Sequence, residues 1–68
     1  MESLRQHRVE QRMTLKQVGN AIGVSAVTIS RYEKGEREPN IDRLKKLSRI
    51  FGTTVDELIA EKKNQEGN

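Results

Sequence analysis

The sequence predicts an all-α fold, a compact bundle of five short helices. Apolar residues recur three or four positions apart along most of the chain, which is the spacing of one helix face. Residue types that cap helix N-termini precede these segments, and glycines follow several of them. With 68 residues and no cysteine, the chain forms one small domain without disulfides or a cysteine-bound zinc ion, so compact helix packing, a partner, or both must stabilise it.

The first two helices are expected over residues 2–12 and 15–22. Leu4 is the main apolar residue of the first. Thr14 precedes the second helix, where its hydroxyl can accept a hydrogen bond from a free backbone N–H group. Gly23 follows it and suits the left-handed conformation that commonly ends a helix.

The third helix is expected from Ser25, as its N-cap, to about Lys34, with Gly35 after it. Residues 24–32 could also be taken for a β-strand, because valine, threonine, isoleucine and tyrosine favour strands. However, no second strand-like segment is present, and a lone strand would leave its backbone groups unpaired. We therefore predict a helix here.

The fourth helix should begin after the N-cap Asn40, because Pro39 disfavours helix at the residue before it. It carries one apolar stripe with spacings of three, three and four residues: Ile41, Leu44, Leu47 and Phe51. Thr54 caps a short fifth helix, whose apolar residues are Val55, Leu58 and Ile59. We expect the domain to span residues 1–62 and the polar segment 63–68 to be disordered.

Gly19 lies inside the second helix, where glycine costs about 1 kcal/mol relative to alanine. Such a residue is expected where another backbone approaches closely. Together with Gly23 it would let the second and third helices cross tightly through a three-residue turn.

The third helix has two different faces when its side chains are placed about 100° apart. Ile29 and Tyr32 fall on the inward face, and Val27, Thr28 and Arg31 on the opposite one. Methyl groups can contact the thymine methyl, and an arginine can bind guanine through two hydrogen bonds, so the outward face suits reading of DNA base edges. The alternatives are that Val27 is an ordinary core residue and that Arg31 is a solvated charge.

The segment "TLKQVGNAIGVSAVTISRYEKGEREPNIDRLKKLSRIFGTTVDELI" resembles the lambda repressor/Cro-like helix-turn-helix (XRE) family. The resemblance covers about residues 4–60 and rests on the small residue Gly19, the turn residue Gly23, the flanking apolar positions, and the motifs "SRYEKG" and "PNIDRL". It implies a five-helix DNA-binding domain whose third helix enters the major groove. It also implies homodimers on palindromic operators, in phage repressors and bacterial regulators.

The resemblance also assigns roles to individual residues of this chain. The base-reading positions are Ala26, Val27 and Arg31. The phosphate-contacting positions are Ser25, Thr28, Lys34 and Arg37. Leu15 stands where the family often has a DNA-contacting glutamine, so Lys16 or Gln17 is expected to contact phosphate instead. A structural ion pair is implied between Arg8 and Glu33.

The function indicated is a cytoplasmic, sequence-specific regulator of transcription, a repressor that binds double-stranded DNA as a homodimer. The net charge of +3 is compatible with an anionic partner. The alternative is a protein-interaction module on the same fold, of antitoxin type or a transcription adaptor. It would be expected to expose a larger apolar patch on the third helix.

An enzyme is not indicated. The chain has no cysteine nucleophile, no phosphate-cradling loop and a single histidine, so we expect no metal, no cofactor and no small-molecule ligand. No apolar segment approaches the roughly 18 residues needed to span a membrane, and the polar N-terminus lacks the apolar core of a secretory signal.

Overall fold

A computed structural model describes residues 1–59, and these residues form five α-helices without a strand. The helices are α1 (Glu2–Glu10), α2 (Leu15–Ile22), α3 (Ala26–Lys34), α4 (Ile41–Phe51) and α5 (Val55–Ile59). The predicted all-α fold is confirmed. The expected domain end at residue 62 and the segment 63–68 lie outside the described residues. No helix within residues 1–59 is both long and apolar enough to cross a bilayer.

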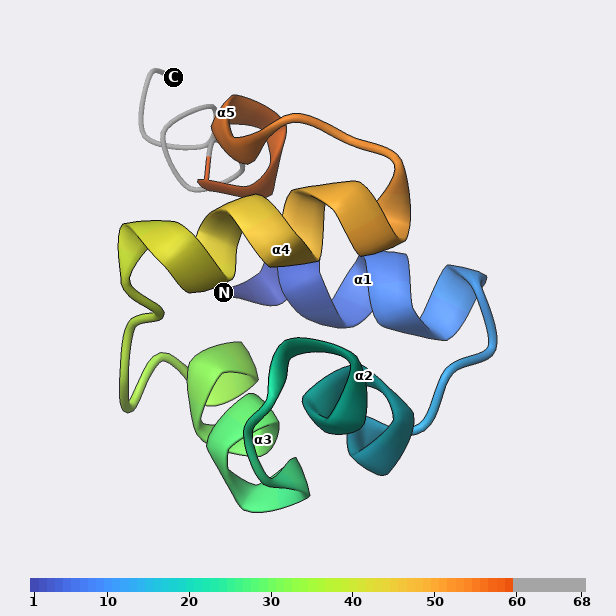
Figure 1. Ribbon diagram of the computed structural model, residues 1–68, viewed down its shortest axis with the longest axis vertical. Helices are drawn as coiled ribbons and strands as arrows, with labels where there is room; N and C mark the ends of the chain where they lie inside the picture. Colours follow the sequence, from blue (N-terminus) through green and yellow to red (C-terminus); the bar gives the residue numbers. More distant parts are fainter. Residues whose placement is uncertain (60–68) are drawn as a thin grey trace.

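The helices pack so that α2 and α3 lie together on one side of α1 and α4, while α5 lies on the other side (Figure 1). Every helix contributes to one apolar core. Its buried members are Leu4, Val18, Ile22, Ile29, Tyr32, Leu47, Phe51 and Leu58. Among the helix pairs, α2 and α3 pack most extensively against each other. One face of α3 is buried in the core, through Ile29 and Tyr32, whereas Val27 is exposed to solvent.

The helix starts are encoded locally, as the sequence predicted. In each of three helices the N-cap side-chain oxygen accepts a hydrogen bond from the backbone N–H three residues later. The bonds join Thr14 to Gln17 (3.0 Å), Ser25 to Thr28 (3.1 Å) and Asn40 to Arg43 (2.9 Å). Gln17 also bonds back to the Thr14 N–H, which completes a capping box.

The start of α5 is stabilised through Glu57. The Thr53 hydroxyl and the Thr54 backbone N–H both donate to the Glu57 carboxylate. These hydrogen bonds, with that from Thr53 the larger influence, hold the pKa of the Glu57 carboxyl below its usual value because they favour its charged form. Thr54 in turn accepts from the Glu57 N–H at 3.0 Å.

The first helix ends earlier than predicted, at Glu10, where the expectation was residue 12. Arg12 adopts a left-handed conformation with φ of 58°. Its N–H bonds to the Val9 carbonyl, and the Met13 N–H reaches back to the Arg8 carbonyl, which is the Schellman pattern of a helix end. The sequence held no signal for this end because arginine, unlike glycine, rarely takes that conformation.

The apolar stripe of α4 is also shorter than predicted. Ile41, the first residue of α4, is 57% exposed, and Leu44 is half-buried without being part of the core. Leu47 and Phe51 are buried as expected. In α5, Leu58 is fully buried whereas Ile59 is 40% exposed.

Candidate nucleic-acid interface

The crossing of α2 and α3 depends on Gly19. A Cβ atom at this position would lie 2.6 Å from the Val24 carbonyl oxygen and 3.1 Å from the Ser25 carbonyl carbon. The expectation that Gly19 faces another backbone is therefore confirmed. Gly23 has φ of 84°, and the Val24 N–H bonds to the Gly19 carbonyl at 2.9 Å, so the chain turns directly from α2 into α3.

The inward face of α3 is anchored by Ile29 and Tyr32, which are almost completely buried. The Tyr32 hydroxyl accepts a hydrogen bond from Arg43 Nη1 at 3.1 Å. The N-terminal amine of Met1 donates to the carbonyl oxygens of Tyr32 (2.7 Å) and Glu33 (3.1 Å) at the end of the helix. A positive charge is favourable there because the carbonyl groups of the last helical turn carry partial negative charge.

Arg8 and Glu33, the pair expected from the resemblance, form a two-bond ion pair between α1 and α3. Arg8 Nε lies 2.6 Å from Glu33 Oε2, and Arg8 Nη2 lies 3.2 Å from Glu33 Oε1. The two side chains are only 16% and 7% exposed. Arg8 Nη1 also donates to the Met13 carbonyl at 3.0 Å, so one guanidinium links α3 to the segment after α1.

The outward face of α3 carries the predicted base-reading residues. Val27 is 60% exposed, so the alternative that it is a core residue is wrong. Arg31 is exposed and has no ion-pair partner among residues 1–59, while Ala26 and Thr28 are half-buried. Because Ile29 and Tyr32 fix the rotation of the helix, these side chains project from a rigid surface.

The residues expected at phosphates lie at the two ends of α3 and in the first turn of α2, apart from Arg37 in the loop after α3. Ser25 and Thr28 sit together at the start of α3, with their hydroxyl oxygens 3.0 Å apart. Lys34 is exposed at the end of α3, and Lys16 and Gln17 are exposed in the first turn of α2. The Gln17 side-chain oxygen already accepts the Thr14 N–H, which leaves its amide N–H groups as donors.

Leu15 is the residue at which this chain departs from the expected family pattern. It is half-buried and packs against the apolar core. The neighbouring Lys16 and Gln17 are exposed in the same turn of α2.

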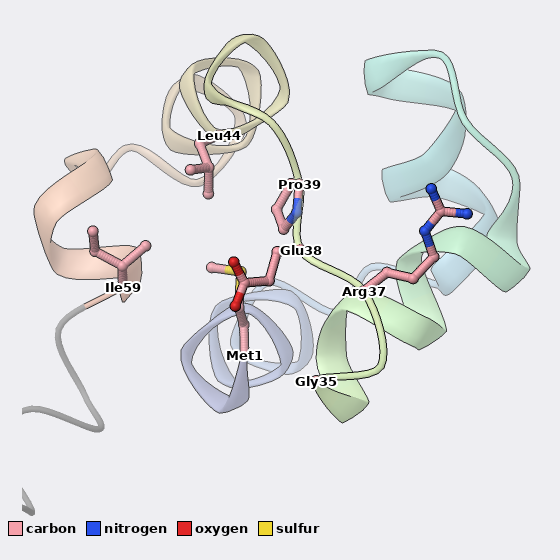
Figure 2. Close-up of a pocket in the computed structure, with 7 residues that line it drawn as sticks. All are labelled: Met1, Gly35, Arg37, Glu38, Pro39, Leu44 and Ile59. Carbon is pink, nitrogen blue, oxygen red and sulfur yellow. The ribbon is translucent and has the colours of Figure 1, made fainter.

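Arg37 lies in the loop between α3 and α4, beside a surface groove of about 200 Å³. The groove is lined by Met1, Gly35, Arg37, Glu38, Pro39, Leu44 and Ile59. In Figure 2 the Arg37 guanidinium extends away from the other lining side chains, whereas the Glu38 carboxylate lies beside Met1. None of the outward-face residues Val27, Thr28 and Arg31 is among the residues that line this groove.

One contact to the candidate interface was not predicted from the sequence, the bond from Arg43 to Tyr32. A signal existed, since a buried tyrosine hydroxyl needs a hydrogen-bond partner. The donor could not be chosen from the sequence because several arginines and lysines follow Tyr32.

The geometry defines a helix-turn-helix domain, and comparisons with known proteins agree. A helix-turn-helix family model matches residues 4–58. The transcriptional activator BcrR of Enterococcus faecalis is 37% identical over 59 residues, which cover 87% of this chain and 29% of that protein. The cryptic phage CTXphi transcriptional repressor RstR of Vibrio cholerae is 34% identical over 58 residues, 85% of this chain and 52% of that protein.

Among solved structures, the P22 c2 repressor protein in complex with a synthetic operator superposes with a TM-score of 0.81. It is 35% identical, and the match covers 84% of this chain and 86% of the repressor chain. The chain therefore belongs to the lambda repressor/Cro-like helix-turn-helix (XRE) family of DNA-binding transcriptional regulators. The chain matches curated relatives that are transcriptional regulators. It spans about half or less of the length of these curated relatives.

Proposed function

We propose that this chain regulates transcription by binding a specific double-stranded DNA operator, and that it acts as a repressor by occupying that site. The observation that carries the proposal is the outward face of α3, where Val27 and Arg31 are exposed on a helix whose inward face is locked into the core. The P22 c2 repressor, which shares the fold, is bound to operator DNA in its solved structure. An activator among the relatives means that the direction of regulation needs its own test.

In the proposed complex, α3 enters the major groove and its residues have separate tasks. Arg31 donates two hydrogen bonds to a guanine, and the methyl groups of Ala26 and Val27 contact thymine methyls. Phosphate contacts position the domain without reading sequence directly. These contacts come from Ser25, Thr28, Lys34, Arg37, Lys16 and Gln17.

Lys34→Ala is expected to weaken binding to all DNA sequences about equally. A wild-type salt titration on duplex DNA should give an affinity that falls steeply with salt, with a log–log slope of about −0.9 per phosphate neutralised. Lys34→Ala should reduce that slope by about one. The matched control is Lys46→Ala, which removes the same charge from the exposed side of α4 and should leave the slope closer to wild type.

The wild-type arm of this titration also tests the proposed function itself. If the folded protein shows no duplex binding even at low salt, regulation through DNA contact is wrong. The protein-interaction alternative would then be favoured. A Lys34→Ala slope equal to that of wild type would remove Lys34 from the phosphate contacts.

We further propose that the protein binds a palindromic operator as a homodimer. One domain presents one α3 and so reads one half-site, whereas two copies would place their α3 helices about 34 Å apart, one turn of DNA. The exposed apolar side chain of Ile59 at the end of α5 supports α5 as a source of interface area. Sedimentation is expected to give two chains per two-half-site duplex, and one chain per such duplex at saturation would contradict this.

A further inference from the structure

We propose that Arg43 is a positioning residue for sequence recognition, because its hydrogen bond to the Tyr32 hydroxyl sets how α3 presents Arg31 to DNA. The inference rests on the proposed DNA-binding function and adds a residue that does not itself touch the bases. It starts from the 3.1 Å bond between Arg43 Nη1 and the Tyr32 oxygen.

Tyr32 is suited to fix the rotation of α3. It directly precedes Glu33 and directly follows Arg31, and only 1% of its surface is exposed. A phenylalanine would fill the same core space, so the hydroxyl has a polar role and needs a donor there. Tyr32 and Arg31 are neighbours on one helical turn. Any rotation of α3 that moves the tyrosine ring therefore also shifts the Arg31 side chain within the major groove of the bound DNA.

Arg43, the donor of this bond, links α4 to α3. α3 packs mainly against α2 and α1 and makes little direct contact with α4. Arg43, in the first turn of α4, joins the two helices through its side chain, while its backbone N–H bonds to the cap residue Asn40. Asn40 follows the loop that carries Arg37, one of the proposed phosphate contacts. Arg43 therefore connects the base-reading helix to a segment that is proposed to hold the DNA backbone.

The consequence differs for the two kinds of DNA contact. A two-bond contact from arginine to guanine tolerates little misplacement, whereas a flexible side chain follows a phosphate through small displacements. Loss of the Arg43–Tyr32 bond should therefore reduce discrimination at the base pair that Arg31 reads more than it reduces binding to unrelated DNA.

The test is a double-mutant cycle with Tyr32→Phe, Arg43→Gln and the double variant. For each protein, affinities are measured for the selected operator and for single-base variants of it, at one salt concentration and a temperature where circular dichroism shows full folding. A typical hydrogen bond corresponds to about a fivefold change in equilibrium constant. We expect each single variant to lose about that factor in discrimination at the Arg31 base pair, and the double variant to lose no more than either single.

Arg49→Gln is the matched control, since it removes the same charge from an exposed position of the same helix. It should change affinity for all DNA alike and leave the preference profile intact. The inference is overturned if Tyr32→Phe and Arg43→Gln stay within about twofold of the wild-type discrimination, or if their losses add. Equal losses at every base pair would also overturn it, because they indicate a merely structural role. A wild-type protein without any sequence preference would instead refute the proposed function, and this inference with it.

Discussion

Gly19→Ala is expected to destabilise the protein, although alanine is the better helix former. The added Cβ would lie 2.6 Å from the Val24 carbonyl oxygen, and the atoms it meets belong to backbone, which cannot move aside as a flexible side chain can. Forcing extra volume into such a site typically costs about 1–3 kcal/mol. We expect this steric cost to exceed the roughly 1 kcal/mol that alanine gains over glycine in helix propensity. Urea unfolding monitored by circular dichroism measures the change in the free energy of unfolding.

The control for this prediction is Asn20→Ala, one residue further along α2. Asn20 is exposed, so alanine there should gain helix propensity without meeting any atom and should leave stability unchanged or slightly higher. If Gly19→Ala proves as stable as wild type, the close approach of α2 to the turn before α3 is wrong. The crossing that positions α3 would then have to be reconsidered.

Breaking the ion pair between α1 and α3 should have the largest effect on stability. Arg8→Met keeps much of the side-chain volume but leaves the carboxylate of Glu33, whose side chain is only 7% exposed, without its cation. Removing one partner of a buried pair typically costs about 3–5 kcal/mol. The Met13 carbonyl loses its donor as well. Because a small domain has little stability in reserve, such a loss should leave a large fraction of the variant unfolded even without denaturant.

Arg5→Met is the matched control on the same helix. Arg5 pairs with Glu2 at 3.8 Å, but both side chains are more than half exposed, so this variant should change stability by no more than about 0.5 kcal/mol. Replacing both members of the buried pair, as in Arg8→Met with Glu33→Leu, should recover part of the lost stability, because no uncompensated charge remains. Equal unfolding midpoints for Arg8→Met and Arg5→Met would contradict the buried character of the pair.

Most of the fold could be predicted because its signals are local. Thr14, Ser25 and Asn40 cap the helices that follow them, and each makes its bond within three residues. The end of α1 could not be predicted, because arginine rarely adopts the left-handed conformation that Arg12 has, so the residue type gives no signal for it. The exposure of Ile41 was missed for a similar reason, since helical spacing gives the direction of a side chain but not how far the core extends.

Which residues of the candidate interface are exposed could be predicted where they lie on one helix, α3. The spacing of Ile29 and Tyr32 fixed which side of α3 is inward, and the exposure of Val27 and Arg31 follows from it. Contacts between helices were harder to predict. The Arg8–Glu33 pair was expected only through the family resemblance, and the Arg43–Tyr32 bond was not expected at all, because neither sequence spacing nor composition says which distant side chains meet.

The central claim is that the outward face of α3 reads DNA sequence, and Arg31 is the residue that tests it most directly. The operator is first selected from a random duplex pool with the wild-type protein. Binding of Arg31→Ala is then measured on that operator and on every single-base variant of it. We predict that Arg31→Ala loses its preference at one base pair of each half-site, a G·C pair, where wild type should discriminate by about 1–3 kcal/mol, and keeps its preferences elsewhere. A preference profile identical to that of wild type at every position would show that Arg31 is not the base reader and that the outward face of α3 has been assigned wrongly.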